Sequence, residues 1–462
     1  MNRWYTKVKD WERYDYRLLS RSRIPEYRRG FPVFYITRLS SRLAMSCYPC
    51  VHHVEIGVVD GPATVECLKL HYGFKVIAFK QSAVADQWLL VRNDTRFLVT
   101  SLKTGDQELL KDDNYVINWT ATKTSSELPS KDSVFNIAFQ VKNIDAFIQR
   151  LENQGVDLSK SLRVVSDSEG TVRTCVVKSI VGDVHHTLIE KSDYAGVFLP
   201  CFEPVGQGNL QSDQHAEQSL IYFDHAAMSA EMNTTTAIIA WYERCFGMKK
   251  FIINRDEDKE NGLVLSTDKV GLRLRAMEYW KCAEVGLLAA DTDDGHERLP
   301  IVIGEALSSE PENFADNQIE SWIRQHGGPG IQHIAIYTPD IKSTVRSLKL
   351  SGATFAKPPP DTYYSEIGRL HDIIKAGEDI EGLKENGILI DTEADGIFEV
   401  ERKQSKENKE SYLLQIFTKP LLPSDPFFLE LIQREGATGF GSGNVEALYR
   451  SVQAYIVDGS SP

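Results

Sequence analysis

The sequence predicts an α+β protein with two domains, each formed by two βαβββ modules whose curved mixed sheets pair into open barrels. Three observations lead to this prediction. The chain has 462 residues, which is too long for one ordinary hydrophobic core and suits two domains of roughly 150 to 200 residues. A strand–helix–strand pattern recurs four times, twice in each half of the chain. Between the halves, the polar, glycine-containing stretch EPVGQGNLQSDQHAEQ at 203–218 predicts a linker.

The four repeats form two matching pairs. The units that begin at Val51 and at Phe223 each contain an apolar strand, a helix that ends near a Gly-Phe or Phe-Gly pair, and another strand. The units that begin at Phe135 and at Ile331 each contain an apolar strand, then Asn-Ile or Asp-Ile opening an amphipathic helix, then a glycine stop and a second apolar stretch. The interior of the half-open barrel that such units form is a natural site for a small ligand.

These patterns set the domain boundaries that we expect. The predicted order is a basic leader at 1–46, an N-terminal domain at 50–202, the linker at 203–218, a C-terminal domain at 219–440, and a closing helix and tail at 441–462.

The first 46 residues differ from the rest in charge. They contain nine Arg and two Lys against two Asp and two Glu, a net charge of +7, and no acidic residue lies between Arg28 and Ser46. An Arg-rich, Ser-containing, acid-poor leader is typical of a mitochondrial transit peptide. The four acidic residues before Arg28 are unusual in such a leader. Two other interpretations of this segment therefore stay open: a disordered basic tail, or a protein that truly starts at Met45 rather than Met1. A cytoplasmic location is the alternative to a mitochondrial one.

Charge and composition exclude several classes of partner. The net charge of −13 gives the whole protein no electrostatic match to nucleic acid or to an anionic membrane. The sequence contains no run of about 18 apolar residues, so we expect no membrane span. The seven cysteines are odd in number and scattered, and CYPC at 47–50 is their only close pair, so they give weak evidence for zinc and favour a reducing compartment.

Three residues of the second domain suggest a metal site. His225, His333 and Glu430 each lie in an apolar, strand-like stretch, and side chains on neighbouring strands of a barrel can converge inside it. Two histidines and one carboxylate leave three positions open on an octahedral iron(II), so that substrate and O₂ can both bind. A hydrogen-bonded core histidine is the alternative for either His taken alone.

The first domain offers an internal comparison with this site. His53 corresponds roughly to His225 and Glu190 to Glu430, whereas Asn136 stands where His333 would be. Because that half has lost a good ligand, we expect it to lack metal and to serve as a scaffold.

The chain resembles the 4-hydroxyphenylpyruvate dioxygenase family of the vicinal-oxygen-chelate superfamily, and within it the 4-hydroxyphenylpyruvate dioxygenase-like branch. The motifs that carry the resemblance span most of residues 50 to 455: GVFLPCFEPV, FDHAAMS, GPGIQHIAIYTPDI, YLLQIFTKP and FFLELIQREGATGFGSGN.

The resemblance implies an iron(II)-dependent oxygenase that acts on an aromatic 2-oxo acid and O₂. By motif position, the Fe(2+) ligands fall on His225, His333 and Glu430. The implied substrate-binding residues are Gln318, Gln332, Gln415, Phe417, Phe428 and Val445, and a closing lid is implied at Phe440, Gly441 and Asn444. The three glutamines could instead hold the metal ligands in place. The family also implies a homo-oligomer.

Departures from the family's pattern bear on the product. Homogentisate-forming members end the last motif with GNF, whereas this chain has GNV, with Val445 in place of the phenylalanine. Hydroxymandelate synthases have an aliphatic residue there, so we expect benzylic hydroxylation to 4-hydroxymandelate. Pocket segments also differ, at GLRL from Gly271 and GEAL from Gly304, where Arg273 or Arg275 could face a carboxylate or solvent. A homogentisate-forming enzyme of tyrosine catabolism and a non-catalytic binding protein remain as alternatives.

Overall fold

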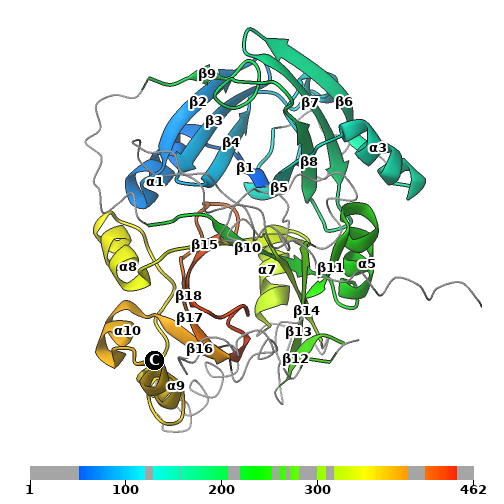
Figure 1. Cartoon of the computed structure of the whole chain (residues 1–462). Helices are drawn as coiled ribbons and strands as arrows, with labels where there is room; N and C mark the ends of the chain where they lie inside the picture. Colours follow the sequence, from blue (N-terminus) through cyan, green and yellow to red (C-terminus); the bar gives the residue numbers. More distant parts are fainter. Residues whose placement is uncertain are drawn as a thin grey trace, which may run out of the picture. The chain divides into compact units, whose positions relative to one another are not determined.

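The structure is a computed structural model of the whole chain (Figure 1). It describes residues 51–119, 128–156, 158–206, 219–251, 257–258, 261–266, 271–279, 299–307, 317–393 and 411–444. All of them lie in one compact unit, Ser46–Pro462. The predicted leader and most of the predicted linker and closing helix lie outside the described residues, so those boundaries stay predictions.

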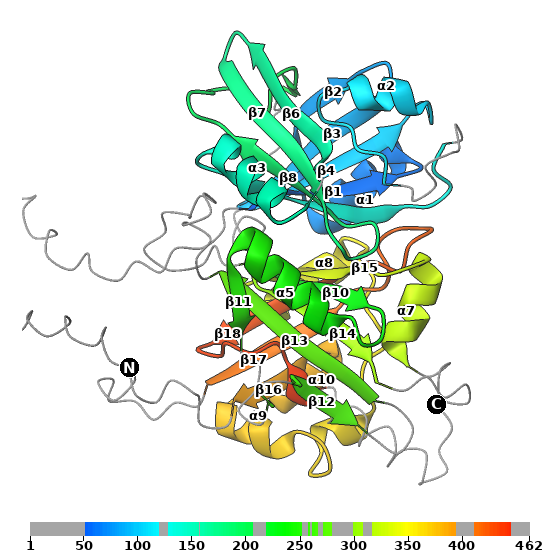
Figure 2. The ribbon, with the colours of Figure 1, turned by 90° about the vertical axis from the view of Figure 1, so that its right-hand side faces the viewer.

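The first sheet has nine strands in the order β6-β7-β8-β5-β1-β4-β3-β2-β9. Its strands are β1 (Val51–Val58), β2 (Lys75–Gln81), β3 (Ala85–Arg92), β4 (Thr95–Leu102), β5 (Ser133–Gln140), β6 (Leu158–Asp167), β7 (Gly170–Lys178), β8 (His185–Glu190) and β9 (Glu203–Pro204). The helices of this half are α1 (Gly61–Tyr72), α2 (Gln107–Asp112) and α3 (Ile144–Asn153). Figure 2 shows α3 beside β7 and β8.

The second sheet also has nine strands, in the order β11-β13-β14-β10-β15-β18-β17-β16, with β12 paired to β13. Its strands are β10 (Phe223–Ala230), β11 (Met248–Phe251), β12 (Leu263–Ser266), β13 (Gly271–Tyr279), β14 (Ile301–Ala306), β15 (Gly330–Tyr337), β16 (Leu389–Glu393), β17 (Ser411–Phe417) and β18 (Phe428–Glu435). The helices are α5 (Thr235–Phe246), α7 (Gln318–His326), α8 (Ile341–Leu350), η1 (Asp361–Tyr364), α9 (Leu370–Ala376) and α10 (Ile380–Asn386).

The predicted module recurs four times. Each copy starts with a strand and a helix and continues with three further strands, to which the third copy adds β12. Parallel and antiparallel pairs occur in both sheets, and the first strands of two modules form the antiparallel centre of each sheet, β1 with β5 and β10 with β15. The prediction of an α+β fold with paired βαβββ modules and curved mixed sheets is confirmed.

The predicted helix boundaries follow from capping chemistry. Asn143 and Asp340 accept a hydrogen bond from the third residue beyond them and so start α3 and α8. Gly73 and Gly247 end α1 and α5 in the left-handed conformation, at φ +68° in both cases. These are the Asn-Ile and Asp-Ile starts and the Gly-Phe and Phe-Gly ends that the sequence predicts.

Two β-bulges recur at matching places in the two sheets. The pairing of β10 with β15 skips Asp224 on one strand and Gln332 on the other, and the pairing of β1 with β5 skips His52 and Phe135. A bulge inserts one residue that has no cross-strand partner, so it changes the direction in which neighbouring side chains point. The position of these bulges therefore governs what faces the interior of each barrel.

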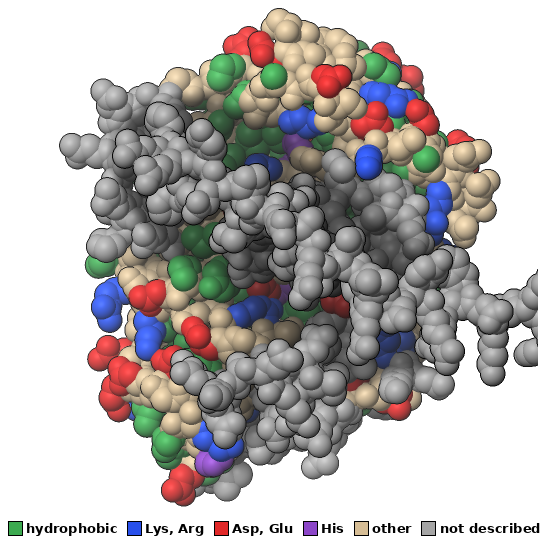
Figure 3. All heavy atoms as spheres, in the orientation of Figure 1, with side chains coloured by type: hydrophobic (Ala, Val, Ile, Leu, Met, Phe, Trp, Pro, Cys, Tyr) green, Lys and Arg blue, Asp and Glu red, His purple; other side chains and the backbone are tan. Residues whose placement is uncertain are grey.

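The visible surface carries charged side chains of both signs, as the composition predicts. Acidic and basic side chains of the described residues are interspersed on the face that Figure 3 shows. None of the helices that the structure describes is long and apolar enough to cross a membrane.

Candidate metal centre

Three strands bring the predicted ligands together. His225 lies on β10, His333 on β15 and Glu430 on β18, and these strands are neighbours in the sheet. His225 and Glu430 both stand opposite Ala335, two residues after His333, so all three side chains project from the same face. The ligand atoms lie within 4.8 Å of one another. In the sequence, His225 and His333 are 108 positions apart and His333 and Glu430 are 97 positions apart, whereas their strands are neighbours in the sheet.

The three side chains meet at one carboxylate oxygen. Glu430 Oε2 lies 3.4 Å from His225 Nε2 and 3.2 Å from His333 Nε2. The side chains of His225 and Glu430 are each 2% exposed and that of His333 is 12% exposed, so the centre is buried but reachable from one side. In Figure 3, histidine, acidic and basic side chains are visible together where the lower part of this face is hollowed.

Each imidazole is held from behind by a hydrogen-bond acceptor. His225 Nδ1 lies 2.8 Å from Asp224 Oδ1, and His333 Nδ1 lies 3.2 Å from Gln332 Oε1. Asp224 and Gln332 are the two bulge residues, which explains how each reaches the ring of its immediate neighbour in the chain. Because each Nδ1–H is donated outward, the Nε2 atom of each ring faces Glu430 and could bind a metal once it carries no proton. Outer carboxylate or amide partners of this kind orient metal-binding histidines.

The donor set fits a divalent metal ion. Glu430 Oε1 is buried and has no hydrogen-bond partner in the described part of the chain, an arrangement that is costly unless another group satisfies it. A metal at this point would bind Glu430 and both Nε2 atoms. Two histidines and one carboxylate on one face, with no thiolate, is the pattern of non-haem iron(II) oxygenases.

The electrostatics agree with a cation at this place. Burial disfavours the charged form of the His225 ring, but Glu430 and Asp224 outweigh burial and raise its pKa to about 9. Burial lowers the pKa of His333. Burial would raise the pKa of Glu430, yet the neighbouring His225 holds it below its usual value. Without metal, His225 therefore carries a proton between two carboxylates, and a bound dication would replace that charge.

Aromatic side chains surround the His333 side of the centre. The ring of Phe428 stacks on His333 at a centroid distance of 4.9 Å, and Phe417 lies 6.2 Å from His333 and 5.8 Å from Phe428. Both phenylalanines are partly exposed. The structure thus places these predicted substrate-binding residues beside the centre.

One of the predicted lid residues contacts the His225 side of the centre. The edge of the Phe440 ring meets the His225 ring at a centroid distance of 4.9 Å and an angle of 70°. Gly441, at φ +70°, lies so close to Gln415 that an added Cβ would stand 2.0 Å from Gln415 Oε1. Asn444 Oδ1 accepts a hydrogen bond of 2.6 Å from the Tyr363 hydroxyl. Phe440 therefore lies against His225, whereas these contacts of Gly441 and Asn444 lead to Gln415 and Tyr363, and their role as a lid stays a prediction.

Other predicted residues lie elsewhere or beyond the described chain. Gln332 bonds to His333 and to Ser229 Oγ, so it supports a ligand. Gln318 is exposed at the first position of α7, and its contact with substrate stays a prediction. Val445 lies outside the described residues. Arg273 faces a protein carboxylate, since its Nη1 lies 2.7 Å from Glu305 Oε1.

The register of the first sheet corrects one proposed equivalence. Strands β1 and β5 pair in the same register as β10 and β15. In this register Asn136 occupies the position of His333, and His53 occupies the position of His225, as predicted. Along β8, however, Thr187 rather than Glu190 occupies the position of Glu430. Glu190 matches Gln433 instead. These two side chains accept from the first backbone N–H of α3 and α8, at 2.6 and 2.9 Å.

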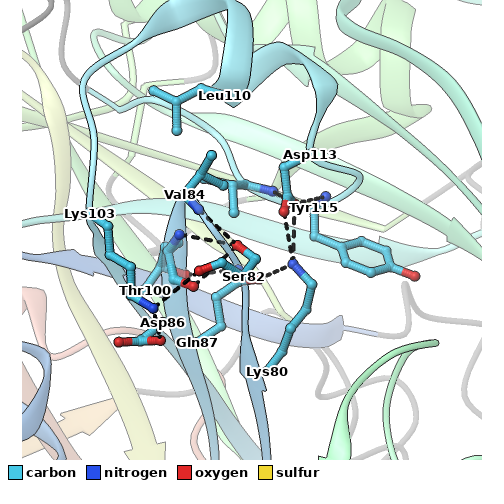
Figure 4. Close-up of polar contacts among 12 residues, drawn as sticks. Lys80, Ser82, Val84, Asp86, Gln87, Thr100, Lys103, Leu110, Asp113 and Tyr115 are labelled. Carbon is cyan, nitrogen blue, oxygen red and sulfur yellow. Dashed lines mark hydrogen bonds and ion pairs between the residues drawn. The ribbon is translucent and has the colours of Figure 1, made fainter.

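A buried polar row replaces the metal centre in the first half. Glu55 accepts hydrogen bonds from Thr100 at 2.7 Å and from Asn136 at 2.8 Å. Thr100 in turn accepts from Gln87, and Lys80 donates to Gln87 and to Asp113, as Figure 4 shows. Burial raises the pKa of Glu55 to about 7. Asn136 and Thr187, which stand where His333 and Glu430 do in the second half, are thus hydrogen-bonded to each other, and Asn136 also to Glu55; the scaffold role stays a prediction.

The sequence prediction included Gln332 as a residue that could hold a ligand, but it missed the two groups behind His225. Asp224 and Arg434 form a two-point ion pair, with N–O distances of 2.6 and 2.7 Å. The available signals were an aspartate next to His225 in an otherwise apolar strand, and an arginine four residues after Glu430, on the same face of β18. Charged residues in such positions are rarely buried without a partner.

Comparisons with known proteins agree with this geometry. The family described as Glyoxalase/Bleomycin resistance protein/Dioxygenase superfamily matches residues 223–373, which include His225 and His333. The mouse protein named 4-hydroxyphenylpyruvate dioxygenase-like protein is 30% identical over 407 residues, which cover 87% of this chain and 95% of the mouse protein. The chain belongs to the 4-hydroxyphenylpyruvate dioxygenase family.

Further members of the 4-hydroxyphenylpyruvate dioxygenase family match over similar lengths. The 4-hydroxyphenylpyruvate dioxygenase of Neurospora crassa is 28% identical over 87% of this chain and 90% of its own length. A solved structure of a mutant of 4-hydroxymandelate synthase from Streptomyces coelicolor superposes with a TM-score of 0.63, at 20% identity, over 89% of this chain and 99% of that chain. The structural match shows a shared fold.

Proposed function

We propose that the protein is an iron(II)-dependent dioxygenase that converts 4-hydroxyphenylpyruvate and O₂ to 4-hydroxymandelate and CO₂. The observation that carries the proposal is the convergence of His225, His333 and Glu430, with buried support for each ring, in a member of the 4-hydroxyphenylpyruvate dioxygenase family. The names of the related proteins support the substrate class.

Iron(II) bound at this centre would supply the electrons that activate O₂ and would hold the 2-oxo acid beside it. The protein's own residues orient and enclose the reactants. Phe417 and Phe428 offer faces against which an aromatic ring can pack. Phe440 lies against the His225 side, and closure of the segment from 437 to 444 over the centre would exclude water during turnover.

The product is proposed from Val445. An aliphatic residue there leaves space beside the substrate ring, so the substrate's side-chain CH₂ rather than the ring would be hydroxylated. Homogentisate formation is the alternative product, and a non-catalytic binding protein is the alternative of another class. The three convergent ligands oppose the binding protein, because binding alone has no need for a buried metal centre.

Product analysis tests the proposal. Purified protein is incubated with iron(II), ascorbate and 4-hydroxyphenylpyruvate in air, and the products are separated and identified by mass spectrometry. We expect 4-hydroxymandelate, and the Val445→Phe variant should shift the product towards homogentisate. Homogentisate from the parent protein would keep the iron site and refute the interpretation of Val445.

Histidine variants separate catalysis from folding. His333→Ala should lose both stoichiometric iron and turnover, whereas His371→Ala should keep both, because the His371 side chain is 79% exposed on α9. A parent protein that binds no iron after reconstitution would favour the binding-protein alternative.

Location and assembly are proposed from the sequence and the family. We infer mitochondrial import directed by residues 1–46, with a cytoplasmic location as the alternative, and a homo-oligomer. Fluorescent fusions with and without residues 1–46 test the first inference, and light scattering of the purified protein tests the second.

A further inference from the structure

Arg434 lies at the junction between the metal centre and the segment that covers it. It is on the same face of β18 as Glu430, four residues further along, and its side chain is 17% exposed. Among the described residues, its guanidinium group donates four hydrogen bonds, two to a carboxylate and two to backbone carbonyls. A planar group that uses four donors at once is held in one orientation.

Two of these hydrogen bonds reach the support of a metal ligand. Arg434 Nε lies 2.7 Å from Asp224 Oδ2 and Nη2 lies 2.6 Å from Asp224 Oδ1. The same Oδ1 atom accepts from His225 Nδ1 at 2.8 Å. Because the fork of the guanidinium group fixes the plane of the carboxylate, Arg434 sets the direction from which Asp224 holds the His225 ring.

The other two hydrogen bonds reach the covering segment. Arg434 Nη1 donates to the carbonyl oxygens of Gly439 at 2.7 Å and of Ala437 at 3.2 Å, and the guanidinium carbon lies 5.8 Å from the centre of the Phe440 ring. Phe440 in turn meets His225. Arg434, Asp224, His225 and Phe440 therefore form a closed circuit of contacts.

The far end of the segment is fixed by a separate anchor. Gly443 N–H donates to Asp391 Oδ2 at 3.0 Å, and Asp391 pairs with Arg369 at 2.8 Å. Among the described residues, the hydrogen bonds of this anchor lead to η1, α9 and β16 rather than to a predicted metal ligand. The segment is thus attached to the scaffold at one end and to the ligand circuit at the other.

We propose that Arg434 is a positioning residue that couples closure of the segment at 437–444 to the orientation of the ligand His225. The inference rests on the proposed function, since it takes His225 as a metal ligand. A metal that fixes His225 would stabilise the closed segment through Asp224 and Arg434, and the closed segment would favour metal binding to the same extent. A lysine cannot replace this arginine, because an ammonium group lacks the fork that bridges a carboxylate and two carbonyls.

Hydrogen–deuterium exchange of the segment tests the proposal, with cobalt(II) as an air-stable metal and equilibrium dialysis as the measure of binding. In the parent protein we expect saturating cobalt to slow exchange of the backbone N–H groups of 437–444 by about tenfold. In Arg434→Lys, cobalt should still bind but slow exchange less than about threefold. Asp224→Asn keeps the shape of the side chain and removes the ion pair, so cobalt should again bind but slow exchange by less than about threefold. This second variant tests the proposal if Arg434→Lys fails to fold.

Asp391→Asn is the matched control at the other end of the segment. It should speed exchange with and without cobalt while keeping the ratio of about tenfold, because the ligand circuit remains intact. If both circuit variants keep the parental ratio while binding cobalt, the coupling is refuted and the metal site stands. If dialysis shows that the parent protein binds no cobalt, the metal site fails and the coupling fails with it.

Discussion

Glu55 should make the first half less stable as the pH rises from acid to neutral. The carboxyl group is 1% exposed, and the two hydrogen bonds that the structure gives it come from the neutral groups of Thr100 and Asn136. Burial raises its pKa from 4.5 to about 7. A folded-state pKa above the unfolded one means that the folded protein holds the proton more tightly, so this stability is present below pH 4.5 and is lost as the pH passes through 7.

The size of the effect follows from the two pKa values. At about 1.4 kcal/mol per pH unit, the interval corresponds to about 3 kcal/mol, most of which falls between pH 5 and pH 8. Glu55→Gln cannot ionise, and the Thr100 hydroxyl can turn to accept from its amide. The free energy of unfolding in urea is measured for both proteins at pH 5 and pH 8. The variant should gain about 2 to 3 kcal/mol relative to the parent between these pH values.

The exposed Glu108, on α2, provides the control for this comparison. Glu108→Gln changes a surface carboxylate in the same half and should shift stability by less than about 0.5 kcal/mol at either pH. Equal pH dependence in the parent protein and in Glu55→Gln would refute the reasoning, because it would mean that Glu55 titrates alike in the folded and unfolded chain.

Three further outcomes follow from the contacts. Gln332→Ala removes the acceptor behind His333 and should weaken metal binding about 10- to 100-fold, as measured by equilibrium dialysis with cobalt(II), with unchanged circular dichroism. Tyr242→Phe leaves the buried His186 Nε2, which now lies 2.7 Å from the Tyr242 hydroxyl, without a partner. It should cost about 1 to 3 kcal/mol in urea unfolding, and a smaller loss would show that water replaces the hydroxyl. Gly441→Ala places a side chain at φ +70° and should reduce turnover at least about tenfold, whereas unchanged turnover would show that the segment closes in another way.

Much of the site could be predicted from the sequence because its ligands are chemically conspicuous. A histidine in the middle of an apolar strand, as at His333, and a carboxylate in another, as at Glu430, are unusual enough to indicate a role. The repeats then placed both within one half of the chain. Glu190 shows the limit of this approach, because the repeats match it to Glu430, whereas the strand register gives the position equivalent to Glu430 to Thr187. A shift of a few residues along a strand decides which side chain reaches the interior.

The sequence by itself determined the order of the four modules, the helix starts and ends, and the candidate ligands, because these depend on local periodicity, capping and residue chemistry. The tertiary structure alone decided which polar groups support the ligands. Asp224 and Gln332 reach the rings of their chain neighbours because a bulge falls at each of them. Bulges arise from pairing between strands about a hundred residues apart, and no local pattern in the sequence specifies that register.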